Sequence, residues 1–149
     1  MGKTAVAGAR DRKNKAIRAE VVPKTDKSTL QGFVANHVTK GTKVYTDEAS
    51  AYKGMPFDHE SVNHSVGEYV RDMAHTNGFE SFGALLKRGY QGTFHHISEQ
   101  HLNRYILEFA GRHNIRDLNT ITQTTILAWG MVGKRLKYHE LVGNSGAGQ

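Results

Sequence analysis

Apolar and charged side chains alternate near the start of the chain. Between residues 16 and 22, one side of an extended chain would carry Ile17, Ala19 and Val21. This period of two is typical of a half-buried strand. Residues 3–10 form a second short strand-like run, and the charged residues 11–15 separate the two runs. The pattern predicts a β-hairpin that ends at Pro23, which has no backbone N–H to donate.

The next segment, residues 27–38, has apolar side chains at helical spacing. They are Leu30, Phe33, Val34 and Val38. Thr25 or Asp26 is suited to cap the start of this helix, and Gly41 is expected just after its end. A strand over residues 42–46 follows. The order of strand, helix and strand favours a parallel pair of strands joined by a crossover helix.

Beyond a loop at 53–59 and a short polar strand at 60–65, a helix is expected from about Gly78. Its apolar face would consist of Phe79, Phe82, Leu85 and Leu86, which recur at helical spacing. Two glycines within residues 89–93 should break this helix. The loop that precedes it, residues 67–77, contains side chains that can border a site.

Two more helical segments complete the pattern. One begins at Ser98, ends within residues 110–114, and repeats its apolar side chains at helical spacing as Leu102, Tyr105, Ile106 and Phe109. The other is expected as one helix over roughly residues 121–142. The glycine-rich residues 143–149 are predicted to be disordered. The elements together indicate an α/β fold.

Composition narrows the classes of partner. The chain of 149 residues has a formal net charge of +6 and a pI near 9.6, which favours a polyanionic partner. It contains no cysteine, so disulfides and thiolate metal sites are excluded. No apolar run approaches the 18 or so residues of a membrane span, and the N-terminus has no apolar signal core. We therefore expect no membrane partner.

Two acidic residues are the candidates for chemistry. Asp47 follows the strand at 42–46, and open α/β sheets bind ligands beyond the carboxyl ends of their strands. Glu80 lies beside the apolar face of the helix from Gly78, close to the basic Lys87 and Arg88. Carboxylates near basic residues suit a metal ion that must meet a polyanion. The plainer alternatives are that Asp47 caps a short helix and that Glu80 is an ordinary solvated side chain.

Several ordered motifs resemble the catalytic domain of the ISXO-like DDE transposases of bacterial insertion sequences. They are Val44-Tyr45-Thr46-Asp47-Glu48, Val62-Asn63-His64-Ser65, Gly67-Glu68-Tyr69-Val70, His75-Thr76-Asn77, Glu80-Ser81-Phe82, Leu85-Leu86-Lys87-Arg88-Gly89, Gly92-Thr93-Phe94-His95-His96 and His101-Leu102-Asn103-Arg104-Tyr105. The resemblance covers roughly residues 3–116. It implies an RNase H-like mixed sheet flanked by helices, and DNA cleavage and strand transfer that depend on Mg²⁺ or Mn²⁺. It also implies a cytoplasmic bacterial protein.

The resemblance also assigns roles and boundaries. Asp47 would be the second catalytic and metal-binding carboxylate, and Glu80 the third. Residues 1–116 would form the transposase domain, 117–142 a helical extension and 143–149 a disordered tail. The DNA partners would be the insertion-sequence ends and the target, and the protein could also self-associate as a homo-oligomer.

The chain departs from the family pattern in two places. The first catalytic Asp of the family lies on a strand that precedes the segment corresponding to residues 3–22, so we expect a domain truncated at its N-terminus. Asp11 lies in the basic hairpin turn and does not match that missing position. Gly83 stands where the family usually has a bulky aromatic residue, and a glycine inside a helix costs about 1 kcal/mol relative to alanine.

Basic and polar residues around Glu80 are candidates for DNA contact. They are His75, Asn77, Lys87, Arg88 and Arg104. For any single one, a solvated surface is nearly as good an interpretation. The nine histidines also raise the alternative of zinc, but no His-x-x-x-His pair lies on a confident helix with a supporting acid. A Ser65–His64 pair cannot act together, because neighbours on a strand point to opposite faces.

Two functions therefore remain in competition. The first is a transposase catalytic domain that cuts and joins DNA with divalent metal. The alternative is a catalytically inactive transposase remnant that binds DNA or self-associates through the same surface. Metal-dependent cleavage distinguishes the two, because the remnant would bind DNA in a salt-sensitive way without cutting it.

Overall fold

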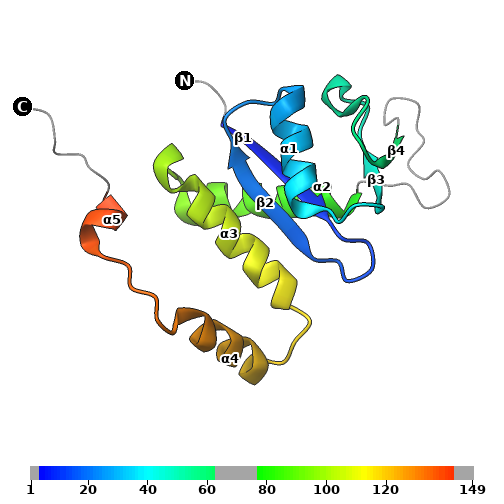
Figure 1. The fold of residues 1–149 in the computed structure, drawn as a ribbon. Helices are drawn as coiled ribbons and strands as arrows, with labels where there is room; N and C mark the ends of the chain where they lie inside the picture. Colours follow the sequence, from blue (N-terminus) through cyan, green and yellow to red (C-terminus); the bar gives the residue numbers. More distant parts are fainter. Residues whose placement is uncertain (1–3, 63–76, 143–149) are drawn as a thin grey trace, which may run out of the picture.

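The computed structural model describes residues 4–62 and 77–142, apart from the side chains of Asn77 and Leu141. Within them, helices pack on both faces of the β1–β2 sheet, and the β3–β4 sheet lies at one edge beyond α1 (Figure 1). The α/β class expected from the sequence is confirmed. The described strands are divided between a sheet of β1 and β2 and a sheet of β3 and β4, so the RNase H-like arrangement remains a prediction.

The N-terminal hairpin forms as the alternating pattern predicts. Strands β1 (Ala5–Arg10) and β2 (Ile17–Val22) pair antiparallel. The Asp11 N–H donates to the Ala16 carbonyl at 2.8 Å, and the Asp11 carboxylate accepts from the Lys13 N–H at 2.7 Å. These bonds close the turn, because the aspartate side chain replaces a backbone acceptor.

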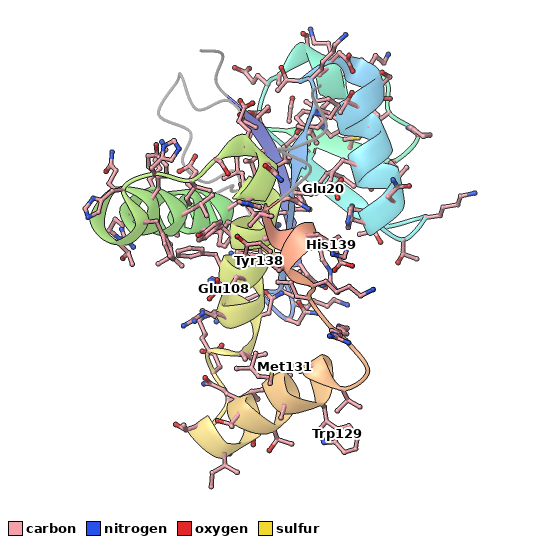
Figure 2. All side chains as sticks on the ribbon, turned by 90° about the vertical axis from the view of Figure 1, so that its left-hand side faces the viewer. Glu20, Glu108, Trp129, Met131, Tyr138 and His139 are labelled. Carbon is pink, nitrogen blue, oxygen red and sulfur yellow. The ribbon has the colours of Figure 1, made fainter. Side chains whose placement is uncertain are left out.

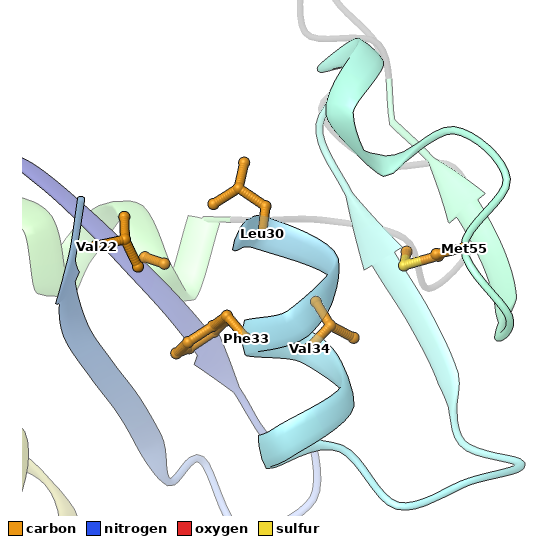
Figure 3. Close-up of a cluster of buried hydrophobic side chains, with 6 residues drawn as sticks. Val22, Leu30, Phe33, Val34 and Met55 are labelled. Carbon is orange, nitrogen blue, oxygen red and sulfur yellow. The ribbon is translucent and has the colours of Figure 1, made fainter. Parts of the chain in front are cut away.

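Helices cover both faces of this hairpin (Figure 2). On one face lies α1 (Lys27–His37), and on the other lie α2 (Asn77–Gly89) and α3 (Glu99–Ile115). The cluster between the hairpin and α1 reaches the loop before β4; its buried members are Ala7, Val22, Leu30, Phe33, Val34 and Met55 (Figure 3). The opposite cluster contains Ile17, Ala19, Phe82, Ile106 and Ala110. Burial of these apolar faces is the main stabilising contribution.

Helix α3 also covers the outer edge of β2. Asn114 accepts from the Ile17 N–H at 2.7 Å and donates to the Ile17 carbonyl at 2.9 Å. Asn103 accepts from the Val21 N–H at 3.1 Å. These side chains satisfy backbone groups that an exposed edge strand would present to other chains.

Helix α1 begins as predicted and ends differently. Asp26 is its N-cap and accepts from the Thr29 N–H at 2.9 Å, which holds the pKa of the Asp26 carboxyl below its usual value. The helix ends at His37 with Val38 already extended. The expectation that Gly41 terminates the helix was wrong. Gly41 lies at φ +84° in a turn closed by the Thr42 N–H and the Thr39 carbonyl at 3.1 Å, where glycine adopts this conformation without a steric cost.

The second sheet corrects the predicted pairing. Strand β3 (Lys43–Thr46) pairs parallel with β4 (Asp58–Ser61), whereas we expected β3 to pair with the strand before α1. The β4 strand also begins earlier than the predicted 60–65. The apolar cluster under α1 includes side chains from both sheets, such as Val44 and Met55, so the two sheets share a core without sharing hydrogen bonds among the described strands.

Helix α2 ends at Gly89, within the range 89–93 in which a break was predicted. Gly89 has α-helical dihedral angles, and the chain continues into a π-helical turn, Tyr90–Phe94. A Cβ atom at Gly89 would collide with the ring of Phe109 on α3. Glycine is therefore required at this point by the close approach of two helices. Helix α3 then runs to Ile115, slightly beyond its predicted end.

Gly83 gives the first testable prediction. A Cβ added there would meet no atom within 4 Å, so Gly83→Ala should stabilise the protein by roughly 0.5–1 kcal/mol through the lower backbone entropy of its unfolded state. The matched control is Gly89→Ala on the same helix, which should destabilise it by about 1–3 kcal/mol because the Phe109 ring must move. Urea denaturation of both variants provides the measurement. Equal shifts in the same direction would contradict this account.

The C-terminal segment is two helices and not one. Helix α4 (Thr120–Met131) and helix α5 (Tyr138–Val142) are separated by residues 132–137, so the single helix expected over 121–142 was wrong. Gly133 at φ +72° turns the chain between them, a conformation that is incompatible with a continuous helix. Arg104 donates to the Glu140 carbonyl at 2.9 Å and holds α5 near α3.

Candidate active site at the end of strand β3

Asp47 lies where the strand-end rule predicts it. It follows β3 directly and its side chain is exposed, while the preceding Thr46 is buried. The Asp47 carboxylate accepts from the Ala49 N–H at 3.2 Å, which forms an Asx turn. The short 3₁₀ helix Ser50–Tyr52 has Ala49 at its N-cap position. Asp47 therefore shapes the turn before this helix, and the expectation that it caps the helix was wrong.

A shallow cavity of about 320 Å³ adjoins Asp47. Its lining residues are Asp47, Glu48, Ala49, Lys53, Gly54, His59 and Ser61. Two carboxylates and a hydroxyl supply the hard oxygen ligands that Mg²⁺ prefers. A lysine in the same wall supplies a positive charge for an anionic substrate. The cavity thus combines groups suited to a metal and to a phosphate.

Behind Asp47, a partly buried hydrogen-bond network connects the two strands. The Thr46 hydroxyl donates to the Asp47 carbonyl at 2.7 Å, which uses its only proton. The 2.8 Å contact between Thr46 Oγ1 and His59 Nε2 must then have His59 as the donor. His59 on β4 therefore supports the backbone that carries Asp47. Sequence reasoning placed His59 in a loop and missed this role.

The charge of Asp47 affects the ionisation of the nearby Tyr52. Burial raises the pKa of the Tyr52 phenol above its usual value, and the nearby Asp47 carboxylate raises it further. Deprotonation of Tyr52 would put a second negative charge near Asp47, which is unfavourable. Tyr52 thus remains neutral and does not compete with Asp47 for a cation.

Glu80 lies in the first turn of α2 and is exposed. Two neighbours fix the helix beneath it: Phe82 is buried, and Phe79 packs against the same cluster. A Cβ at Gly8 of β1 would collide with the Phe79 ring, so α2 lies very close to the hairpin. Glu80 is not among the residues that line the cavity beside Asp47.

Of the five candidate DNA-binding residues, three have described side chains. Lys87 and Arg88 are exposed in the last turn of α2. Lys87 follows Glu80 by seven positions, which places it on the same face of the helix about 10 Å along the axis. Arg104 is exposed too, but its guanidinium already donates to Glu140. His75 lies outside the described residues, and Asn77 is described only by its backbone at the start of α2.

The basic hairpin turn lies close to the strand that leads to Asp47. The Arg12 guanidinium stacks 4.0 Å from the centroid of the Tyr45 ring on β3. This cation–π contact links the hairpin to the second sheet. Sequence analysis recognised the turn as basic but gave no sign of this contact, because it depends on the placement of the two sheets.

The structure also bears on metal binding. Among the described residues, no group of three or more His, Asp or Glu side chains is arranged to hold a metal ion. The chemistry of Asp47 and its cavity nevertheless fits Mg²⁺, which retains several waters and often uses only one or two carboxylates. Within the described part of the chain, no helix has the length and apolar character needed to cross a membrane.

One protein family matches this chain. The model of the ISXO2-like transposase domain matches residues 1–114. No curated protein matches the chain, and no solved structure matches it either. The match includes Asp47, Glu80 and the three basic candidates Lys87, Arg88 and Arg104, and it ends before α4.

Proposed function

The chain belongs to the ISXO2-like transposase domain family, and we propose that it performs metal-dependent DNA cleavage and strand transfer during transposition of an insertion sequence. The observation that carries this proposal is Asp47, exposed directly after β3 beside a cavity lined by acidic and basic groups. In this proposal residues 1–116 form an RNase H-like transposase domain and 117–142 a helical extension. The protein would act in the bacterial cytoplasm, where its DNA substrates lie.

Asp47 and Glu80 are the proposed ligands of Mg²⁺ or Mn²⁺. Bound divalent metal would activate the attacking oxygen and stabilise the leaving oxygen at phosphorus. Asp47 would contribute a carboxylate whose backbone is held by the partly buried Thr46–His59 pair. This support matters because metal-binding side chains need a fixed orientation, which surrounding hydrogen bonds supply.

Glu80 would contribute its carboxylate from a rigid helix. The anchoring of Phe79 and Phe82 in the core fixes the first turn of α2, and sites on helices are more exact than sites on loops. Its proposed partnership with Asp47 is supported by the family match, whose range of residues 1–114 includes both positions.

DNA would be held along the same helix. We propose that Lys87 and Arg88 contact backbone phosphates, since both are exposed and follow Glu80 on α2. Their spacing of about two turns from Glu80 suits a phosphate next to the one being cut. Arg104, His75 and Asn77 complete the proposed DNA contacts. The substrates would be the ends of the insertion sequence and a target duplex.

The experiment that tests this function is a cleavage assay with the natural transposase as it is made in its host. With DNA that carries the element's ends, Mg²⁺ or Mn²⁺ should give cut and joined products, and EDTA should abolish them and leave DNA binding intact. Metal supplies the main stabilisation of the developing charge. Salt-sensitive binding without cleavage under any metal would favour the inactive remnant, and cleavage in EDTA would contradict both interpretations.

A further inference from the structure

The turn between β1 and β2 concentrates positive charge at one end of the hairpin. Residues 10–15 read Arg-Asp-Arg-Lys-Asn-Lys, which sets four basic side chains against one carboxylate. Among residues 4–62 and 77–142, none of these four basic side chains has an ion-pair partner. The turn projects past the end of α1 (Figure 1). This end of the domain therefore presents a net positive charge to solvent.

Hydrogen bonds within the turn fix its backbone. The Asp11 carboxylate accepts from the N–H groups of Lys13 and Asn14 at 2.7 and 3.3 Å. The Asn14 side chain accepts from the Ala16 N–H at 2.8 Å, and Lys15 has a left-handed backbone at φ +59°. The side chains of Lys13, Asn14 and Lys15 are exposed. Because the turn is already ordered, it loses little conformational entropy when it binds a partner.

Arg12 connects the turn to the strand that leads to Asp47. Its guanidinium lies 4.0 Å from the centroid of the Tyr45 ring, and Lys43 Nζ lies 5.4 Å from the same centroid. Lys43 also pairs with Glu60 at 2.9 Å. Tyr45 precedes Asp47 by two positions, which is about 7 Å along an extended chain. The basic turn is therefore held beside the strand that ends at the candidate active site.

The C-terminal end of α3 adds to the positive potential around the turn. Asn114 on α3 bonds to Ile17 of β2, which places this end of the helix beside the turn. Burial lowers the pKa of His113, and the nearby cations Arg116 and Arg10 lower it further, as neighbouring positive charge does to an imidazole. Like charges gathered in this way cost stability, and a bound anion would relieve their repulsion.

The chemistry of the turn favours a nucleic acid over a membrane. Residues 10–15 contain no apolar side chain, so they have nothing to insert below the headgroups of a bilayer. Exposed lysine and arginine are common contacts to the backbone phosphates of nucleic acids. Duplex DNA carries one phosphate charge per roughly 1.7 Å of its axis, so a compact basic turn can contact more than one phosphate at once.

We propose that the hairpin turn binds backbone phosphates of duplex DNA, with Lys13 and Lys15 as the direct contacts. Only the choice of DNA as the polyanion rests on the proposed function. The turn is separate from the DNA contacts proposed on α2, and it would hold a segment that flanks the phosphate being cut beside Asp47. Its contacts would not depend on the DNA sequence, because phosphates carry no sequence information.

The first test measures equilibrium binding of the full chain to a fluorescent duplex over a range of salt concentrations, with EDTA present. The double variant Lys13→Gln/Lys15→Gln should weaken binding about tenfold, as expected when two exposed ion pairs are lost. The slope of log K against log salt should become shallower by about 1.8, or about 0.9 for each phosphate contact. The matched control is Lys24→Gln/Lys134→Gln, which removes the same charge from two exposed lysines outside the turn. It should leave both quantities close to the wild-type values.

Chemical acetylation of the wild-type chain provides a second test that needs no variant. Bound duplex should protect Lys13 and Lys15 from acetylation and leave Lys24 reactive, which mass spectrometry of the digested protein measures. Equal protection of all three lysines would overturn the proposal, as would wild-type binding by Lys13→Gln/Lys15→Gln. Protection of the turn by anionic phospholipid vesicles but not by the duplex would overturn it too.

These results separate the DNA-binding turn from the proposed function. Binding that depends on Lys13 and Lys15, without cleavage under any metal, would contradict the proposed function and support the role of the turn. Cleavage of DNA together with wild-type binding by the double variant would contradict the role of the turn alone. A chain that binds no duplex at low salt would contradict both.

Discussion

Asp47→Asn should reduce DNA cleavage by the natural transposase about 10³-fold or more, as removal of a central catalytic group does in other enzymes. Asparagine retains the side-chain oxygen that accepts from the Ala49 N–H, so the turn after β3 should persist. Only the negative charge and its metal-binding capacity are lost. Glu80→Gln is expected to have a comparable effect, because it likewise preserves the helix and removes a carboxylate.

Two acidic residues outside the proposed site are the controls. Asp58 starts β4, at the opposite end of the two-stranded sheet from Asp47. Glu108 pairs with Arg112 at 2.8 Å on the surface of α3. Asp58→Asn and Glu108→Gln should retain cleavage within a few-fold. If either control lost as much activity as Asp47→Asn, or if Glu80→Gln were fully active, the assignment of the site would be wrong.

Phe82→Ala should lower the free energy of unfolding by about 3–5 kcal/mol, the range typical of a buried phenylalanine. Phe82 is 1% exposed and packs among Ile17, Ile106 and Ala110. Its ring also meets the His113 ring edge-on at a centroid distance of 5.9 Å. Removal of the ring leaves a cavity where α2, α3 and β2 meet, and the helices cannot close it without moving the hairpin contacts.

Urea denaturation followed by circular dichroism measures this loss. Tyr90 is 41% exposed, so Tyr90→Ala serves as the control and should cost less than about 1 kcal/mol. If Phe82→Ala fails to fold, Phe82→Leu can be measured in its place. Its free energy of unfolding should fall clearly less than that of Phe82→Ala, because leucine fills part of the cavity. Equal stability of Phe82→Ala and Tyr90→Ala would contradict the assigned core.

Local patterns predicted the elements whose partners are close in sequence. The hairpin, the cap at Asp26 (one of two candidates with Thr25) and the apolar face of α2 with Phe82 depend on period and capping within one segment. Pairing between distant segments was not predictable in this way, so β3 was given the wrong neighbour. The end of α2 at Gly89 was predicted from the glycines, but the close approach of Gly89 to Phe109 was not, because it depends on the placement of α3.

In the candidate site, too, features within one segment were predictable and contacts between distant segments were not. Asp47 was predicted from its place after a strand, and the structure confirms that place. The contact between Thr46 and His59 depends on the parallel register of β3 and β4, which the sequence does not reveal. The break before α5 at Gly133 was missed because a glycine is tolerated in many helices, and only its positive φ identifies a turn.

Binding of Mn²⁺ to the ¹⁵N-labelled chain tests the central claim most directly, because paramagnetic broadening reports which amides lie near the ion. The account predicts that the amide signals of Asp47, Ser61 and Glu80 broaden first, and that Asp47→Asn removes the effect while Asp58→Asn does not. Broadening centred on His95 and His96, or a pattern unchanged by Asp47→Asn, would contradict the assignment of Asp47 as a metal ligand.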